Sequence, residues 1–484
     1  MRICMIVEGC YPYVVGGVSS WVHAMIKSFP QHEFIIHAIV ANRSVRGKFL
    51  YELPENVVEV REIYLDDDDY VGPMDFKSKR LLKLHERRLS TLGRRALQSL
   101  FEGSDVDFHQ LFQIFQKDHF SIDDVLMGQD FLELAQGYYQ RAYPEIVFTD
   151  FLWTLRSIYL PLFFTLRSTP ARADVYHCIS TGYAGIFGTM GKYLYPDSHL
   201  LISEHGIYTR EREEELIKAS WVKGVYKNIW ISQFHKLSYY AYQCADVVTC
   251  LFKGAKELQI ELGCPKEKIE ITPNGIDMEP FAHLKRKDPC DEFIHIGAIL
   301  RVTPIKDVKT MLMAFHYAKK EEPRLKLWVM GPYDEHIRYY EECLQIVQQM
   351  KIQDVVFTGR VQVHEYLGKM DMTILTSISE GQPLTILESF AAKKPVIATN
   401  VGNCYGLIMG EGKEEKAAGI LTSIMDVNGI SQAILTLARN EKMRKQMGEI
   451  GYERVKESYQ LPMLKQTYEK LYGRWNRGDT TWQE

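Results

Sequence analysis

Short apolar runs alternate with helical patterns along most of this chain, and this alternation limits the fold more than any other feature. In the first half, the strand-like runs are residues 2–7, 34–40, 174–178, 200–203, 247–250 and 269–272. Helical patterns, such as residues 18–29, lie between them. Apolar strands that alternate with helices are typical of βαβ units, so the pattern predicts a parallel sheet covered by helices on both faces.

The alternation begins again near residue 293. The second set of strand-like runs is 293–297, 325–330, 354–358, 372–376 and 395–398, and the tail from 431 to 474 has helical patterns only. Between the two sets lies the segment TPNGIDMEPF, residues 272–281, which is rich in turn-forming residues. We therefore predict an α/β protein of two Rossmann-like domains that face a cleft, at 1–275 and 276–484, with helices at the C-terminal end.

One stretch, residues 66–170, departs from this rhythm because it has helical patterns and few strand signals. We interpret it as a helical insertion in the first domain. It opens on the acidic run 66–69, for which a solvated loop is favoured over a metal site because adjacent carboxylates repel one another. A basic helix is predicted next, either a solvated face or a surface that docks on a partner or membrane. Its cations are Lys77, Lys79, Arg80, Lys83, Arg87 and Arg88.

Composition limits the kinds of partner that the protein can bind and the cellular compartment in which it is expected. The chain has 58 basic and 62 acidic side chains and a formal charge of −4, so it has no global basic field for nucleic acid. Its nine cysteines include no C-x-x-C pair, which favours reduced core thiols. The longest apolar run, 158–166, is about half a membrane span, and the opening residues are too short an apolar run for a signal peptide. We expect a cytoplasmic protein.

The pair Gly16-Gly17 lies between the first strand and the first helix. Glycines at this place let the backbone approach a phosphate or a sugar, and the helix N-terminus attracts an anion. A tight strand-to-helix turn explains the pair equally well. The segment is not G-x-G-x-x-G, and no acidic residue ends the second strand, which argues against a nicotinamide dinucleotide site.

Two cations follow the first strand of the second domain. Arg301 and Lys306 stand five residues apart in the loop before a helix. Such a pair at the end of a strand can straddle a diphosphate and neutralise the charge of a leaving group. Two solvated loop cations are the alternative.

The segment 377–399 carries the most specific pattern. The loop 380–382 follows a strand, and Pro383 suits the first position of a helix. The amides of Leu384 and Thr385 are then free to hold phosphate oxygens. Glu388 lies about one turn further into this helix, where its carboxylate can accept hydrogen bonds from the vicinal hydroxyls of a ribose. The alternative is a capping glutamate in the loop and a surface glutamate on the helix.

A fourth motif, EHGIYTRERE, follows the strand 200–203. A neutral His205 at the end of a strand can donate or accept a hydrogen bond at a substrate, although a loop histidine bonded to backbone is the alternative. Arg210 and Arg212 stand among glutamates. They indicate either an acceptor-binding surface or a helix start with internal ion pairs.

Taken in order, the GG loop, the EHG loop, TPNGID, the R-x4-K loop and the E-G-Q-P-x4-E helix resemble the family-4 retaining glycosyltransferases of the GT-B fold. The resemblance covers most of the chain and is weakest over 66–170. The string EHGIYTRERE, the long insertion and the overall length resemble more narrowly the cytoplasmic glycosyltransferases of bacterial Pel exopolysaccharide synthesis.

The resemblance implies a role for each motif. In the family the R-x4-K cations bind the donor diphosphate, the first glutamate contacts the donor sugar, the second binds the ribose, and the segment FTGRV contacts the base. The implied nucleotide-sugar site is Gly16, Gly17, Arg301, Lys306, Arg360, Val361, Glu380, Gly381, Gln382, Pro383, Leu384, Thr385 and Glu388. The implied catalytic residues are His205, Glu380, Arg301 and Lys306, with Arg210 and Arg212 on the acceptor side. Many relatives have Phe or Tyr where Gln382 stands.

We therefore expect a retaining transferase that moves a sugar from a nucleotide sugar, expected to be a UDP-sugar, to a growing glycan. No Asp-x-Asp motif ends a suitable strand, so we expect no metal or other cofactor. The expected partners are inner-membrane components of a polysaccharide synthase complex, which would hold the protein at the membrane periphery. The alternatives are a nucleotide-sugar epimerase of similar fold and a non-catalytic scaffold of the synthase complex.

Overall fold

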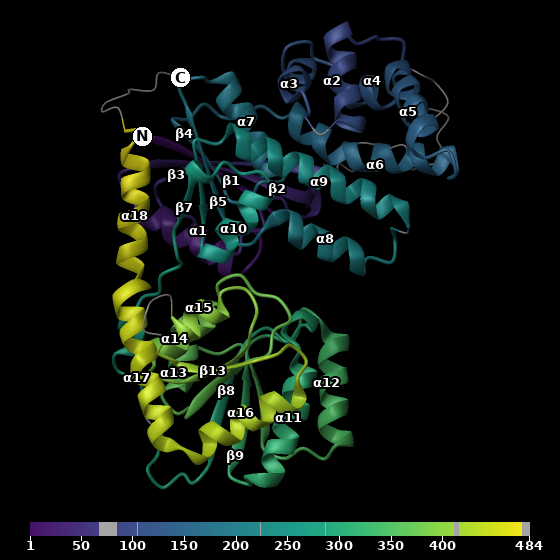
Figure 1. Cartoon of the computed structure of the whole chain (residues 1–484). Coiled ribbons are helices and arrows are strands. Elements are labelled where there is room, and N and C mark those ends of the chain that lie inside the picture. Colours follow the sequence, from purple (N-terminus) through teal and green to yellow (C-terminus); the bar gives the residue numbers. More distant parts are fainter. Residues whose placement is uncertain (67–84, 104, 223, 286, 411–415, 477–484) are drawn as a thin grey trace. The chain divides into compact units, whose positions relative to one another are not determined.

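The computed structural model describes residues 1–66, 85–103, 105–222, 224–285, 287–410 and 416–476 (Figure 1). The chain divides into two compact units. Unit 1 is Met1–Ile271 together with the chain from Glu469, and unit 2 is Thr272–Tyr468.

Unit 1 is built on a seven-stranded sheet in the order β3-β2-β1-β4-β5-β6-β7, in which every neighbouring pair is parallel. Its strands are β1 (Arg2–Glu8), β2 (Glu33–Asn42), β3 (Val57–Asp66), β4 (Val175–Cys178), β5 (His199–Glu204), β6 (Val247–Cys250) and β7 (Ile269–Ile271). The helices α1 (Gly17–Ser28), α7 (Tyr183–Leu194), α8 (Tyr208–Lys218), α9 (Val225–Cys244) and α10 (Lys253–Glu261) connect them. The edge strand β3 was not predicted, because charged residues interrupt its apolar pattern.

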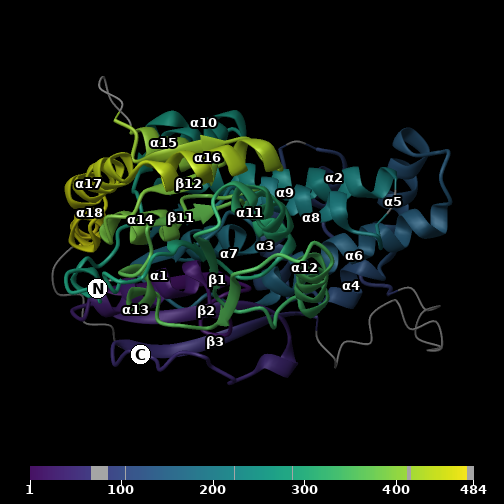
Figure 2. The same ribbon diagram turned by 90° about the horizontal axis from the view of Figure 1, so that it is seen from below.

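The predicted helical insertion is present in unit 1. It consists of α2 (Thr91–Glu102), α3 (Phe108–Gln116), α4 (Ile122–Leu126), α5 (Gln129–Ala142) and α6 (Phe148–Arg167). Figures 1 and 2 show α2, α4 and α5 gathered beside the strands, and α6 packs against β3 and α7. An aromatic core holds the group together, since the ring of Phe101 stacks on Tyr159 at 5.2 Å and meets Phe131 edge-on at 5.0 Å.

Most of the acidic run and of the predicted basic helix, residues 67–84, lies outside the described residues. Its last two cations do not belong to a helix. Arg87 and Arg88 precede α2 in an extended segment, where Arg87 donates to the carbonyl oxygens of Asp118 and His119 and Arg88 pairs with Glu133. Both arginines therefore hold the insertion together, whereas the prediction placed them on a solvated or docking helix face.

Unit 2 has a six-stranded parallel sheet in the order β10-β9-β8-β11-β12-β13. Its strands are β8 (Ile294–Ile299), β9 (Leu325–Met330), β10 (Val355–Gly359), β11 (Met372–Leu375), β12 (Val396–Thr399) and β13 (Gly419–Thr422). Its helices include α11 (Val308–Glu321), α12 (Ile337–Gln349), α13 (Val363–Leu367), α14 (Leu384–Ala391), α15 (Cys404–Met409), α16 (Val427–Arg439) and α17 (Glu441–Ser458). Because all strands are parallel, the loops after β8, β11 and β12 lie at one edge of this sheet.

The final helix α18 (Leu461–Gly473) differs from the prediction, which assigned all C-terminal helices to the second domain. Its last turns belong to unit 1. The reason is the burial of Tyr472, whose hydroxyl lies 2.8 Å from Nδ1 of His177 on β4 and whose ring meets Phe29 edge-on. The ring of Trp475, just beyond the helix, stacks on His199 at 5.0 Å.

Two further expectations concern the chain as a whole. All nine cysteines are free thiols, and most of them are buried. The apolar run 158–166 lies in α6, where most of its side chains face the core of the insertion. No helix in the described ranges is both long enough and apolar enough to cross a bilayer.

Candidate functional site

Two loops meet at the carboxyl edge of the sheet of unit 2. One follows β8 and the other follows β11. The amide of Ile378 donates to the carbonyl oxygen of Ile305 at 2.8 Å. The hydroxyl of Thr376 donates to the carbonyl oxygens of Lys306 and Asp307 at 3.0 and 3.1 Å. These bonds hold the R-x4-K loop against the loop that carries Glu380.

The side chains of Lys306 and Glu380 form an ion pair at this junction. Nζ of Lys306 lies 2.5 Å from Oε1 of Glu380, and the two side chains are 19% and 11% exposed. Two charges this far from water attract each other strongly, but both have lost hydration, so each needs its partner or a ligand. The structure thus brings together two predicted site residues that are 74 positions apart.

Arg301 does not join this pair. Its guanidinium is exposed and lies 2.8 Å from the carboxylate of Glu335, in the loop after β9. The prediction that Arg301 and Lys306 straddle one anion therefore requires Arg301 to leave Glu335. Ion pairs this exposed contribute about 0–1 kcal/mol, so the cost of such a move is small.

The helix α14 begins at Leu384, one residue later than predicted, and Pro383 is its N-cap. The amides of Leu384 and Thr385 therefore lie in the first turn, where the helix offers them no acceptor. Behind them the loop 380–382 is held by α15, since the amide of Asn403 donates to the carbonyl oxygen of Gly381 at 2.8 Å. That this helix start binds an anion stays a prediction, and the two open amides are the groups that would do so.

Glu388 lies one turn further along α14. Burial raises the pKa of its carboxyl group to about 7. No described residue forms a hydrogen bond or an ion pair with this carboxylate. A partly buried carboxyl group that lacks a partner is a good acceptor for two neighbouring hydroxyl groups.

Arg360 and Val361 lie elsewhere on the same edge. They follow β10, which is separated from β11 by β9 and β8. Arg360 is exposed, and Val361 packs against the apolar cluster that contains Ile299 and Met330. The structure therefore places these two residues on the far side of β8 from the α14 start.

Five buried polar atoms of unit 2 were not indicated by any sequence pattern. They are Oδ1 of Asn274, Oγ1 of Thr303, Oδ2 of Asp307, Oγ of Ser377 and Nε2 of Gln382, and none has a hydrogen-bond partner within the described part of the chain. All belong to the linker or to the loops after β8 and β11. Buried polar groups are normally satisfied, so a concentration of exceptions points to a missing ligand or water. Asn274 stands in TPNGID, where only its turn-forming character was noted.

In unit 1, His205 follows β5 and its ring meets Trp21 of α1 at a centroid distance of 4.4 Å. Burial lowers the pKa of His205 to about 4, so the ring is neutral at pH 7. Its Nε2 atom is buried and lacks a hydrogen-bond partner among the described residues. The contact with Trp21 places His205 against the second turn of α1.

Gly16 and Gly17 stand at the start of that helix. Gly16 is extended, with φ −177°, which any residue adopts, and a Cβ at either position would meet nothing within 4 Å. Neither the backbone conformation nor the packing of unit 1 requires glycine here. A tight turn therefore does not explain why these two residues are glycines. The close approach of a ligand to the backbone is the explanation that remains.

The two arginines of EHGIYTRERE behave differently. Arg210 is exposed on α8. Arg212 pairs with Glu215 at 2.7 Å and lies over the ring of Tyr208 at 5.2 Å. The hydroxyl of Tyr208 donates to the buried carboxylate of Glu8 at 3.0 Å, so this segment is tied to the end of β1. Glu8 was not among the predicted residues, and only its place at a strand end signalled it.

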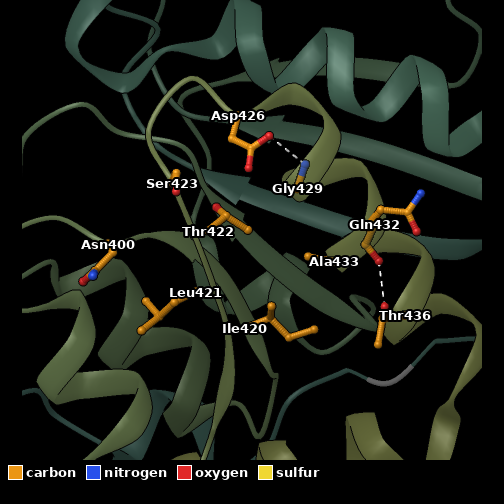
Figure 3. A pocket seen from close by; sticks show the side chains of 10 residues that line it. All are labelled: Asn400, Ile420, Leu421, Thr422, Ser423, Asp426, Gly429, Gln432, Ala433 and Thr436. Atoms are coloured by element: carbon orange, nitrogen blue, oxygen red, sulfur yellow. Dashed lines mark hydrogen bonds between the residues drawn. The ribbon is translucent and has the colours of Figure 1, made fainter.

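A separate depression of about 490 Å³ lies at the end of β13 and along α16 (Figure 3). It is lined by Asn400, Ile420, Leu421, Thr422, Ser423, Asp426, Gly429, Gln432, Ala433 and Thr436. Figure 3 shows the carboxylate of Asp426 turned to the amide of Gly429, which it caps at 2.8 Å. None of the predicted site residues lines this depression. Across the described ranges, no three side chains of the metal-binding types gather into a cluster.

Comparison with known proteins agrees with this architecture. Residues 1–267 match the family described as a domain of unknown function (DUF3492), and residues 291–440 match the glycosyl transferases group 1 domain. The first match covers more than half of the chain. The protein therefore belongs to the DUF3492 family, and part of its second unit matches the group 1 glycosyl transferases.

Curated relatives match part of the chain. N-acetyl-alpha-D-glucosaminyl L-malate synthase of Bacillus anthracis is 28% identical over 242 residues, which are 47% of this chain and 59% of the relative. The amylovoran biosynthesis glycosyltransferase AmsK of Erwinia amylovora is 24% identical over 196 residues, 38% of this chain and 45% of the relative. The chain thus spans about half the length of these relatives.

Solved structures match over nearly the whole chain. Anabaena HepE in complex with UDP has a TM-score of 0.62 at 12% identity, covering 98% of this chain and 100% of the other. Sucrose-phosphate synthase of Thermosynechococcus elongatus has a TM-score of 0.59 at 14% identity, covering 98% of each chain. At this identity the likeness establishes the fold, which is the GT-B fold of two Rossmann-like domains that the sequence predicted.

Proposed function

We propose that this protein is a glycosyltransferase that takes a sugar from a nucleotide sugar bound to unit 2. The observation that carries the proposal is the partly buried Lys306–Glu380 pair, whose glutamate lies in the loop that leads to the open first turn of α14. One turn further along that helix stands the unpartnered carboxylate of Glu388. A diphosphate needs cations and free amides, and a ribose needs an acceptor for two hydroxyl groups. Along the chain, the cation and amides that suit a diphosphate come first, and the carboxylate that suits a ribose follows one helical turn later.

The chemistry follows from this arrangement. Transfer breaks the bond between the anomeric carbon of the sugar and a phosphate oxygen, and an acceptor hydroxyl oxygen forms a new bond to that carbon. The hydroxyl proton passes to the departing diphosphate. Lys306 and the amides of Leu384 and Thr385 stabilise the negative charge that develops on this diphosphate. We assign Glu380 to the sugar, and neutral His205 to hydrogen bonding with a substrate at unit 1.

The finer proposal concerns the donor, the stereochemistry and the pathway. HepE binds UDP and UDP-glucose, and AmsK is described as acting in the biosynthesis of amylovoran. These likenesses support a UDP-sugar as the donor and a growing glycan as the acceptor. We further propose that the transfer is metal-independent, because no Asp-x-Asp motif ends a suitable strand, and retaining, as the resemblance to the family-4 glycosyltransferases implies. The narrow resemblance is to PelF of Pel exopolysaccharide synthesis, and we propose that role, with inner-membrane partners of the synthase complex.

Calorimetric titration of UDP into the full chain tests the nucleotide site. We expect Lys306→Ala and Glu388→Ala each to weaken UDP binding at least tenfold, which corresponds to about 1.4 kcal/mol. Lys309→Ala is the matched control, because this lysine lies on α11 near Lys306 but pairs with Glu342 at 2.6 Å on the surface. If both site variants bound UDP as tightly as the wild type, the assignment of the nucleotide site to Lys306 and Glu388 would be wrong.

A further inference from the structure

The side chain of Gln382 has one satisfied end and one unsatisfied end. Its Oε1 atom accepts a hydrogen bond of 2.7 Å from the backbone amide of Asn274. Its Nε2 atom is buried and has no partner among the described residues. The same holds for Oδ1 of Asn274. The two residues are 6% and 7% exposed, so bulk water does not reach these atoms freely.

The orientation of the Gln382 amide is determined by its neighbour. The oxygen and nitrogen of a glutamine side chain are easily exchanged, and only the hydrogen-bond network decides between them. If the amide of Gln382 were turned over, its NH2 group would face the N–H of Asn274, and two donors would oppose each other. The unsatisfied atom that remains is therefore a donor. No hydrogen bond with a described residue fixes the orientation of the Asn274 side chain, so it offers a second polar amide whose oxygen and nitrogen are interchangeable.

These atoms lie next to the part of the site that we assign to the sugar. Glu380 precedes Gln382 by two residues, and both stand in the loop that ends at the start of α14. The hydroxyl of Thr303, in the loop after β8, is a third buried polar group without a partner in the described ranges. Groups of this kind, fixed by their neighbours and left unpaired, are arranged to be satisfied by a ligand.

We propose that Gln382 and Asn274 form a subsite for one polar substituent of the donor sugar. Nε2 of Gln382 donates to this substituent, and the side-chain amide of Asn274 is its second hydrogen-bonding partner. A ring hydroxyl and an acetamido group share this chemistry. The inference rests on the proposed function, because it requires a nucleotide sugar at unit 2. It assigns a substrate contact to the linker residue Asn274 and to the side chain of Gln382.

Two substitutions separate this role from a structural one. Gln382→Met keeps the length of the side chain but removes both hydrogen-bonding atoms. Gln382→Glu keeps an oxygen that accepts from the amide of Asn274 and replaces the Nε2 donor. A purely structural bond survives in Gln382→Glu, whereas the contact with the sugar does not. Thermal unfolding of both variants then reports how much the bond to Asn274 stabilises unit 2.

The binding test uses UDP, UDP-glucose and UDP-N-acetylglucosamine in parallel titrations of the full chain. We expect Gln382→Glu and Asn274→Ala to leave the affinity for UDP within twofold and to weaken at least one UDP-sugar by fivefold or more. The two sugars differ only at C2, so a larger loss for one donor assigns the subsite to its C2 substituent, the hydroxyl of UDP-glucose or the acetamido group of UDP-N-acetylglucosamine. Equal losses assign it to a hydroxyl group that both sugars carry.

Two outcomes would overturn the subsite. One is an unchanged ratio of UDP-sugar to UDP affinity in both variants, and the other is an equal loss of UDP and UDP-sugar, which indicates a structural role only. If the wild-type chain bound none of the three compounds, the proposed function would fail together with the subsite. The wild-type titration therefore distinguishes the two failures.

Discussion

Glu388 provides a quantitative test of the electrostatics of the site. Its carboxyl group has a pKa of about 7 in the folded protein, against 4.5 for an ordinary glutamate, because burial penalises the charged form. The folded state thus holds a proton between pH 4.5 and 7 that the unfolded state releases. The associated stability is complete below pH 4.5 and is lost as the pH rises to about 7. Between pH 5 and pH 8 this amounts to about 2–3 kcal/mol.

Glu388→Gln removes this titration because the amide is neutral at every pH. The melting temperature of Glu388→Gln relative to wild type is therefore expected to rise by about 5–10 °C between pH 5 and pH 8, at about 2–4 °C per kcal/mol for a unit of this size. Thermal unfolding followed by circular dichroism at several pH values measures this. Glu457→Gln, at an exposed position of α17, controls for the loss of a carboxylate. A difference from wild type that does not change with pH would refute the reasoning.

Two other substitutions test the fold around the site. A Cβ on Gly402 would lie 2.2 Å from the carbonyl oxygen of Glu380, and Gly402 has φ +53°. Gly402→Ala is expected to destabilise the protein by about 2–5 kcal/mol and to weaken UDP binding. Gly359→Ala, with φ +70° but no contact under 3.5 Å, should cost only about 1–2 kcal/mol, and equal losses in denaturant unfolding would contradict the clash. Tyr472→Phe removes the 2.8 Å bond to His177 and should cost about 1–3 kcal/mol, whereas an unchanged melting temperature would show that this bond does not anchor α18.

The sequence predicted the two sheets because most of their strands are short, mainly apolar runs between helices. The edge strand β3 was not predicted because charged residues interrupt its apolar pattern. The edge strand β13 was not predicted either, and it has only four residues, the first of which is a glycine. The assignment of α18 to one domain was incomplete for a different reason. The attachment of its end to unit 1 depends on Tyr472 reaching His177, a contact between residues 295 positions apart that no local pattern contains.

The features of the candidate site also divide into those that local sequence patterns predict and those that depend on tertiary contacts. The start of α14 was predicted to within one residue, because proline and glycine mark such boundaries locally. The salt bridge of Arg301 with Glu335 was not predicted, since it depends on how the loops after β8 and β9 lie. The unpartnered atoms of Asn274 and Gln382 could not be predicted either. A side chain is unsatisfied only in relation to everything packed around it, and sequence gives no measure of that.

Hydrogen–deuterium exchange of the full chain with and without UDP-glucose tests the location of the donor site most directly. We expect slower exchange in the peptides that cover residues 301–307 and 380–388, where Lys306, Glu380 and the first turn of α14 lie. At the same UDP-glucose concentration, these peptides should be protected less in Lys306→Ala than in the wild type, because the variant binds the nucleotide more weakly. Protection confined to residues 420–436, around the depression in Figure 3, or an absence of protection in the 380–388 peptides at saturating UDP-glucose, would contradict the proposed site.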